Sequence, residues 1–169
     1  MLDGKILIVD DNKKILDALR MLFKYQFTHV STSCTPESIP DLLRRDEYDV
    51  ILLDMNFRAG VSSGNEGLFW LGEIQKAQPG ASVVMITAYG DINLAVRAVK
   101  SGAYDFVLKP WENDRLIVTA NAAYRFSRSK REIEALRTKQ RDLIAEINKP
   151  GPDLVGNVWK EWKTEMAFD

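Results

Sequence analysis

The sequence predicts an α/β fold, in which a doubly wound sheet of five parallel strands is followed by a long C-terminal helical extension. Three observations support this prediction. Short apolar runs alternate with amphipathic stretches of helical period over the first two-thirds of the chain. Three of these runs are nearly continuous in Val, Ile and Leu, as strands buried on both faces of a parallel sheet are. From residue 114, a helical pattern continues without a breaker to Pro150.

The expected strands cover residues 5–9, 28–33, 49–53, 82–87 and 104–108. The second run is more polar than the others, which favours an edge position in the sheet. Helical spacing of apolar residues places the intervening helices near residues 15–23, 39–43, 68–74 and 92–99. Asn12 is the candidate N-cap of the first helix, Thr35 before Pro36 begins the second, and Gly102 ends the fourth.

The composition is that of a globular protein rather than a disordered or fibrous one. The 169 residues are 46% apolar and 28% charged, with a net charge of −1, so no basic excess points to nucleic acid. Cys34 and His29 are the single residues of their types, which excludes an internal disulfide and a cysteine-based zinc site. No apolar run approaches the ~20 residues of a membrane span, and the N-terminus does not resemble a signal peptide. We therefore expect a cytoplasmic protein without a membrane segment.

The spacing of apolar residues in the C-terminal third of the sequence predicts a helical linker. We expect a domain over residues 1–125, a coiled-coil linker over 126–149 and a tail over 150–169 that begins a truncated output domain. The seam of the coiled coil would be Phe126, Ser129, Ile133, Leu136, Gln140, Leu143 and Ile147. The charges between Arg128 and Arg141 would be its solvated flanks. This pattern predicts a parallel homodimer; the alternative is a helix that folds back or frays. Trp159 and Trp162 in the tail have no assigned role.

Acidic side chains follow two of the apolar strands. Asp10 and Asp11 come directly after the first, and Asp54 comes directly after the third. In a sheet of this kind the carboxyl ends of the central strands meet at one crevice. Three carboxylates there repel one another, and a divalent cation such as Mg²⁺ would allow all of them to stay ionised.

Two other strand ends add a hydroxyl and a positive charge, from Thr87 and Lys109. A carboxylate nucleophile, a metal, a hydrogen-bond donor and a cation are what transfer of a phosphoryl group to an aspartate requires. Separately, each aspartate is as easily a helix cap or turn residue. Together, these residues predict formation of an aspartyl phosphate.

Four segments resemble the signature segments of response regulator receiver domains, the phosphoryl-accepting domains of two-component systems. They are Val9-Asp10-Asp11-Asn12, Leu53-Asp54-Met55, Ile86-Thr87-Ala88-Tyr89 and Leu108-Lys109-Pro110-Trp111. Their order and their places at successive strand ends make the combination specific. The resemblance covers residues 4 to about 125 and implies a flavodoxin-like sheet of strand order 2-1-3-4-5.

The resemblance also implies roles for single residues. Asp54 would be the phosphoacceptor. Asp10, Asp11, Asp54 and the backbone carbonyl of Asn56 would hold Mg²⁺. The domain would catalyse only its own phosphorylation and dephosphorylation, with a sensor histidine kinase as the donor.

The remaining roles implied by the resemblance concern the switch. Lys109 would pair with the phosphoryl oxygens, and its peptide bond to Pro110 would be cis. Thr87 and Phe106 would form the switch pair, in which the hydroxyl moves toward the phosphoryl group and the ring turns inward. Phe106 stands where many relatives have tyrosine, so the two ring positions are expected to differ less.

Residues 87–91 and 102–106 resemble most the receivers of nitrogen regulatory protein C type, which are sigma-54-dependent transcriptional activators. In that group a helical linker joins the receiver to an AAA+ ATPase and a DNA-binding domain, which would lie outside this chain. The tail segment 154–157 faintly resembles the start of that ATPase.

The chain departs from the receiver pattern after the phosphoacceptor. Arg58 and Ser62 replace the usual proline and glycine, and the glycine match moves to Gly67. The loop over residues 57–66 therefore looks enlarged, and we expect it to be mobile or to fold over the acidic crevice.

Three alternatives remain at the level of sequence. A hydrolase of the haloacid dehalogenase type also forms an aspartyl phosphate, but it needs an acid/base aspartate where Asn56 stands. A flavodoxin-type flavin module lacks support, because Asp10 and Asp11 replace a phosphate-binding loop. A receiver without any DNA-binding output fits the residues as well.

Overall fold

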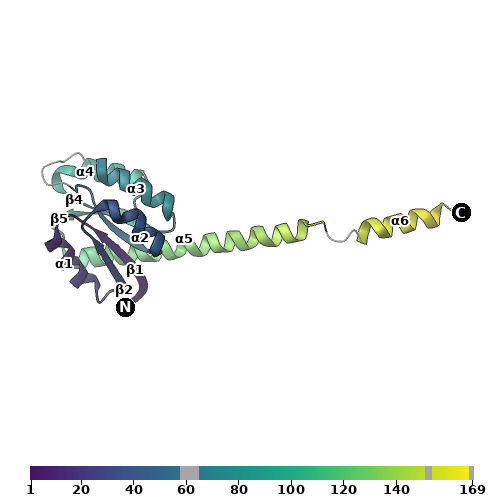
Figure 1. The fold of residues 1–169 in the computed structure, drawn as a ribbon, viewed down its shortest axis with the longest axis horizontal. Helices are drawn as coiled ribbons and strands as arrows, with labels where there is room; N and C mark the ends of the chain where they lie inside the picture. The colour runs from purple at the N-terminus through teal and green to yellow at the C-terminus, as the bar shows by residue number, and fades with distance from the viewer. Residues whose placement is uncertain (58–64, 151–153, 168–169) are drawn as a thin grey trace. The chain divides into compact units, whose positions relative to one another are not determined.

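The computed structural model describes residues 1–57, 65–150 and 154–167, with side chains of the last segment from residue 160 onward. It divides into two compact units, Met1–Arg131 and Glu132–Asp169. The first unit confirms the predicted fold, because its five strands are all parallel and follow the order β2-β1-β3-β4-β5. Figure 1 shows the helices flanking this sheet.

Strands and helices alternate along the first unit. They are β1 (Leu2–Val9), α1 (Lys13–Phe23), β2 (Phe27–Ser33), the 3₁₀ turn η1 (Pro36–Ser38), α2 (Ile39–Arg45), β3 (Val50–Asp54), α3 (Asn65–Ala77), β4 (Ser82–Ala88), the 3₁₀ turn η2 (Tyr89–Asp91), α4 (Ile92–Lys100), β5 (Asp105–Lys109) and α5 (Asn113–Asn148). The last helix continues into the second unit, which also contains α6 (Leu154–Met166).

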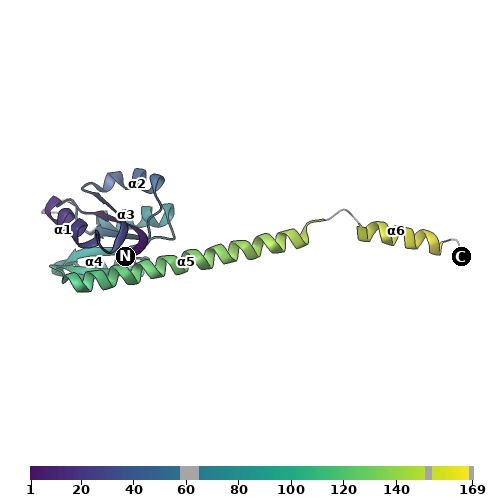
Figure 2. The same cartoon turned by 90° about the horizontal axis from the view of Figure 1, so that it is seen from below.

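Two apolar layers cover the two faces of the sheet. On β1, Ile6 and Ile8 pack with α1 and α5, whereas Leu7 and Val9 pack with α2, α3 and α4. Figure 1 shows α2, α3 and α4 on one side of the sheet and α1 on the other, and Figure 2, turned by 90°, shows the long course of α5. Successive side chains of a strand point to opposite faces, so a strand covered on both sides must be apolar throughout. The continuous apolar runs of the sequence have this origin.

The predicted helix ends fall where the sequence places them, with one difference. The Asn12 side chain accepts hydrogen bonds from the Lys14 and Ile15 amides and caps α1. Gly102 follows α4 with a φ of +113°, a conformation that glycine adopts without strain. Thr35 precedes the 3₁₀ turn η1 rather than α2 directly, and its side chain makes no capping hydrogen bond.

Polar contacts attach the part of α5 within the first unit to the amino-terminal edge of the sheet. Arg131 and Arg128 form ion pairs with the buried carboxylate of Asp49, at 2.5 and 3.2 Å. Ser127 donates a hydrogen bond to the Gly80 carbonyl. These contacts correct the interpretation of Arg131 as a solvated coiled-coil flank, whereas the Arg128 side chain remains half exposed. Buried partners on the sheet bind both arginines, because α5 passes the amino-terminal edge of the strands.

Phe126, the first residue of the expected seam, also contacts the first unit. Its ring lies 5.2 Å from the Tyr104 ring, and the Lys130 ammonium lies 4.9 Å above it. The first unit thus extends past the domain boundary expected at residue 125.

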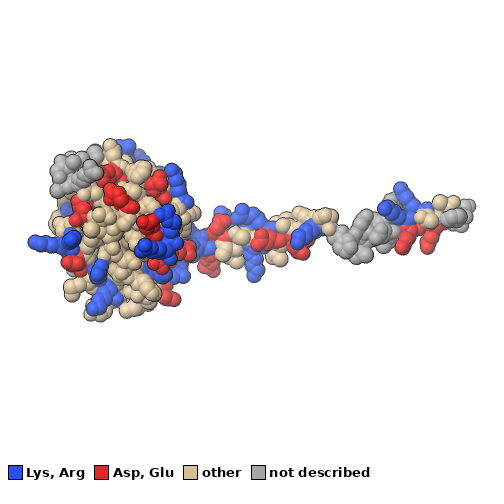
Figure 3. All heavy atoms as spheres, viewed as in Figure 1, with Lys and Arg blue, Asp and Glu red and all other residues tan. Residues whose placement is uncertain are grey.

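The second unit carries exposed apolar side chains on α5. Ile133, Leu136, Leu143 and Ile147 are all at least half exposed. Charged side chains of both signs accompany them over the described residues (Figure 3). Arg141 and Glu134 form an ion pair at 2.9 Å on the helix surface. This helical segment has the exposed apolar positions of the predicted seam.

Candidate functional site

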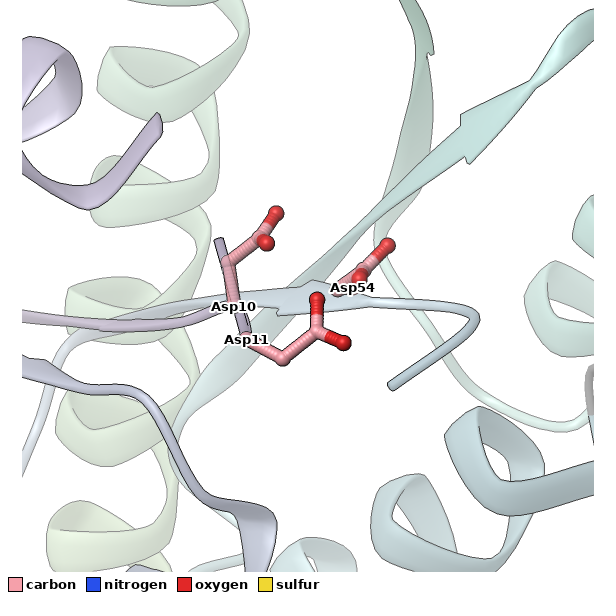
Figure 4. A group of neighbouring side chains, drawn as sticks. All are labelled: Asp10, Asp11 and Asp54. Atoms are coloured by element: carbon pink, nitrogen blue, oxygen red, sulfur yellow. The ribbon is translucent and has the colours of Figure 1, made fainter. Parts of the chain in front are cut away.

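The three aspartates of the sequence pattern meet at the carboxyl edge of the sheet. Asp10 and Asp11 follow the last residue of β1, and Asp54 is the last residue of the neighbouring β3. One carboxylate oxygen from each lies within 4.8 Å of the others. Figure 4 shows the three side chains projecting beyond the two strand ends into the same space. Asp10 and Asp54 are buried, and Asp11 is exposed at the mouth.

Asp10 is held in place by the backbone beside it. Its Oδ1 accepts a hydrogen bond of 2.9 Å from the Asn12 amide, and Asn12 in turn caps α1. The turn between β1 and α1 therefore fixes the direction of this carboxylate.

Lys109 brings a positive charge to the cluster from the end of β5. Its Nζ lies 3.1 Å from Asp10 Oδ2 and 3.1 Å from Asp54 Oδ1. Burial lowers the pKa of Lys109, but the negative charges of Asp54 and Asp10 outweigh this and raise it overall. The ammonium is therefore charged at neutral pH. The peptide bond to Pro110 is cis, as the resemblance implies.

Among the described residues, the Lys109 ammonium alone does not balance the carboxylates. Burial raises the pKa of Asp54 to about 6, the charge of Asp10 adds to this rise, and Lys109 opposes it. Burial and the charge of Asp10 also raise the pKa of Asp11. Three converging oxygen donors with an excess of negative charge fit a divalent cation of the Mg²⁺ kind. Asp10, Asp11 and Asp54 are the side chains that would hold it.

Thr87 and Phe106 lie close to this edge. Thr87 is buried near the end of β4, in register with Leu108 of β5, and its hydroxyl lies 3.4 Å from the Ala88 carbonyl. Phe106 is half-buried and packs on the apolar layer shared with α2, α3 and α4. The hydroxyl thus stands one residue before the end of β4, on the strand next to that of Asp54.

Asn56 binds a residue that sequence reasoning missed. Its side-chain amide donates a hydrogen bond of 2.8 Å to the carboxylate of Asp91, at the start of α4. In the sequence, Asp91 stands directly before a predicted helix. This position ordinarily indicates an N-cap and does not predict a bond to Asn56.

The expected enlarged loop falls largely on residues 58–64, which lie outside the described residues. At its far end, a Cβ added to Gly67 would lie 2.8 Å from the Met55 carbonyl oxygen. Only glycine permits this approach of α3 to the backbone after the phosphoacceptor candidate. The close packing of α3 against Met55 therefore explains why the glycine of the receiver pattern is found at Gly67.

Comparison with known proteins agrees with this arrangement. Residues 6–121 match the response regulator receiver domain family. This chain belongs to that family. The receiver match rules out the hydrolase and flavin-module interpretations of the fold.

Solved receivers resemble this one closely. The N-terminal receiver domain of a two-component response regulator from Bacteroides fragilis is 48% identical, and the alignment covers 73% of this chain and 98% of that chain with a TM-score of 0.66. The receiver domain of NtrX from Brucella abortus is 33% identical, with coverage of 71% and 98% and a TM-score of 0.64.

The curated relatives are longer proteins. A putative NtrX-like response regulator of Rickettsia bellii is 30% identical over 95% of this chain and 32% of its own length. The response regulator protein PilR of Pseudomonas aeruginosa is 35% identical over 66% of this chain and 24% of its own length. The receiver chain thus spans about a third or less of these relatives. Among the described residues, no helix has the length and apolarity of a membrane span.

Proposed function

We propose that this receiver accepts a phosphoryl group from a sensor histidine kinase on Asp54, with Mg²⁺ bound, and thereby controls an output domain. The observation that carries the proposal is the contact of Asp54 with Lys109 at 3.1 Å, within a cluster whose carboxylates approach to 4.8 Å. A nucleophile, a fixed cation and a cation site meet there, which is the requirement for phosphoryl transfer to a carboxylate.

The transfer exchanges one bond for another. An oxygen of the Asp54 carboxylate attacks phosphorus, the phosphorus–nitrogen bond to the kinase histidine breaks, and the bonding electrons stay on the imidazole nitrogen. Asp10, Asp11, Asp54 and the Asn56 backbone carbonyl would hold Mg²⁺, and its positive charge would offset the negative charge of the phosphoryl group. Hydrolysis of the aspartyl phosphate by water would return the Asp54 carboxylate and inorganic phosphate.

Lys109 and Thr87 would act on the product. The Lys109 ammonium already lies beside the nucleophilic carboxylate, and it would pair with a phosphoryl oxygen once the acyl phosphate forms. The Thr87 hydroxyl would donate to another oxygen. Its movement would leave space behind it, into which the half-buried Phe106 ring would turn.

The test uses a small donor in place of the kinase. Acetyl phosphate with Mg²⁺ should add one phosphoryl group per chain, detected by intact mass and located at Asp54 by peptide mapping. Asp54→Ala should take up none, and Asp11→Ala should take up little because its metal site is damaged. Asp17→Ala, at an exposed position on α1, is the matched control and should behave as the wild type. Equal phosphorylation of Asp54→Ala would refute the assignment.

We further propose an output of the sigma-54-dependent kind. The segments that resemble nitrogen regulatory protein C type receivers support it, and so do the NtrX and PilR relatives. NtrX from Brucella abortus, solved in complex with ADP, is 32% identical over 95% of this chain and 34% of that chain, with a TM-score of 0.72. An ATPase domain and a DNA-binding domain after this segment would pass the signal to transcription. An ATPase motif in the gene after codon 169 would test this.

The linker over residues 126–149 is proposed to pair with a second copy. Ile133, Leu136 and Leu143 are half or more exposed, and a parallel coiled coil would cover them. Wild-type protein should sediment as a concentration-dependent dimer, and the double variant Leu136→Asp, Leu143→Asp as a monomer. Thr138→Asp, on the opposite side of the heptad, is the control and should leave the dimer intact. A monomer at every concentration, with or without phosphorylation, would contradict the pairing.

A further inference from the structure

The hydrogen bond between Asn56 and Asp91 joins two loops that serve different parts of the site. Asn56 lies two residues after Asp54, and Asp91 lies between β4, which carries Thr87, and α4. The amide nitrogen and the carboxylate oxygen are 2.8 Å apart, and the contact is partly buried. The loop after the phosphoacceptor is thereby tied to the start of α4.

Asp91 has a second possible partner that it does not use. It occupies the N-cap position of α4, where an aspartate normally accepts hydrogen bonds from the amides of the first helical turn. Its side chain makes no such bond, and the carboxylate instead accepts the hydrogen bond from Asn56. The first amides of α4, those of Asn93 and Leu94, therefore lack the side-chain acceptor that their position provides.

The helix that Asp91 begins is fixed by small buried side chains and by Leu94, which packs partly buried on the apolar layer. Only Ala95 and Ala98 of α4 are buried, and both have small side chains. Ile92 and Val99 remain more than a third exposed. At the far end, Gln75 of α3 donates a hydrogen bond of 3.0 Å to the Ser101 carbonyl. The bond of Asn56 to Asp91 adds a polar attachment at the start of this helix.

We propose that Asp91 is a positioning residue that exchanges its carboxylate between the Asn56 amide and the N-terminus of α4 when Asp54 is phosphorylated. This inference rests on the proposed phosphorylation of Asp54. Phosphoryl oxygens are strong hydrogen-bond acceptors, and they would compete with Asp91 for the Asn56 amide. The added negative charge also repels the Asp91 carboxylate. Once released, Asp91 caps α4, so that the state of the acidic site changes the order of a helix outside it.

Two substitutions of Asp91 distinguish its bond to Asn56 from its capping of α4. Serine is a good N-cap but is too short to replace the bond to Asn56, whereas alanine can do neither. In the unphosphorylated whole chain with Mg²⁺, amide hydrogen exchange at Asn93 and Leu94 should be about fivefold slower in Asp91→Ser than in the wild type, as expected for one ordinary cap. Asp91→Ala should show no slowing.

Phosphorylation by acetyl phosphate supplies the second readout. Wild-type exchange at Asn93 and Leu94 should slow to the level of Asp91→Ser, and Asp91→Ala should stay fast. Because serine already favours the capped state, Asp91→Ser should also be phosphorylated about fivefold faster than Asp91→Ala, which a merely structural role would not produce. Equal exchange in the two variants, or wild-type exchange that phosphorylation leaves unchanged, would overturn the proposal.

The experiments distinguish failure of the proposed phosphorylation of Asp54 from failure of the proposed role of Asp91. Intact mass reports whether Asp54 takes up the phosphoryl group, whatever happens at α4. If it takes up none, the phosphoacceptor assignment fails, while the comparison of Asp91→Ser with Asp91→Ala in unphosphorylated protein still decides whether the carboxylate is withheld from the helix.

Discussion

The two edges of the sheet both carry buried aspartates, in opposite electrostatic settings. At the amino edge, the Asp49 carboxylate accepts a hydrogen bond of 2.9 Å from the Lys5 amide and pairs with Arg128 and Arg131. At the carboxyl edge, Asp10 and Asp54 pair with the Lys109 ammonium, and Asp11 lies beside them. Among the described residues, two arginines match the buried Asp49 and the exposed Glu47 at the first edge, whereas three carboxylates face one ammonium at the second.

This difference separates a structural anchor from the proposed phosphorylation site. The buried Asp49 carboxylate is neutralised by arginines and does not favour a further cation. Its ion pairs also fix α5 against the start of β3. A cluster with excess negative charge is unstable by itself and favours a metal ion, a proton or a change of its chemistry. The same residue type at the two ends of β3 thus serves two purposes, decided by the charges that the fold brings beside it.

Loss of the anchor should have the largest effect on stability. Asp49→Ala removes the acceptor of the Lys5 amide and leaves Arg131 without its buried partner, which should lower the free energy of unfolding by about 3 kcal/mol. Chemical denaturation monitored by circular dichroism measures this change. Asp41→Ala breaks an exposed ion pair with Arg44 and should cost less than about 0.5 kcal/mol. Equal effects of the two substitutions would mean that Asp49 is no anchor.

Metal should act only at the carboxyl edge. Mg²⁺ at 100 times its dissociation constant should raise the free energy of unfolding by about 2.7 kcal/mol, because it binds the folded cluster. Asp11→Ala should weaken this response, whereas Asp17→Ala should retain it. Thermal unfolding across a Mg²⁺ titration is the measurement. A response that survives in Asp11→Ala would place the ion elsewhere.

Removal of one negative charge from the acidic cluster should stabilise the metal-free protein. A folded-state pKa of about 6 for Asp54 lies above its ordinary 3.8, so the ionised carboxylate destabilises the fold. Stability attributable to this group is present below pH 4 and is lost as the pH rises through 6. Asp54→Asn should therefore raise the free energy of unfolding by about 3 kcal/mol at pH 7.5. The gain should shrink toward pH 4.5, and a gain independent of pH would contradict the charge explanation.

Much of the fold and of the acidic site followed from local sequence. Apolar runs such as residues 50–53 predict buried parallel strands because both of their faces are covered. Parallel topology then brings strand ends together, which is why Asp10, Asp54 and Lys109 were expected at one place. The Asn12 cap and the end of α4 at Gly102 depend only on neighbouring residues, and they were also found.

Contacts between polar residues far apart in the chain were decided only by the tertiary structure. Arg131 lies 82 residues from Asp49, and Asp91 lies 35 residues from Asn56. The periodicity of the sequence does not predict such pairs. A polar side chain on a helix surface contacts its distant partner only if the fold brings the two elements together. The sequence by itself determined which strands form and which groups stand at their ends. The tertiary structure decided which charges are compensated, and so which aspartate anchors a helix and which ones keep an excess of negative charge.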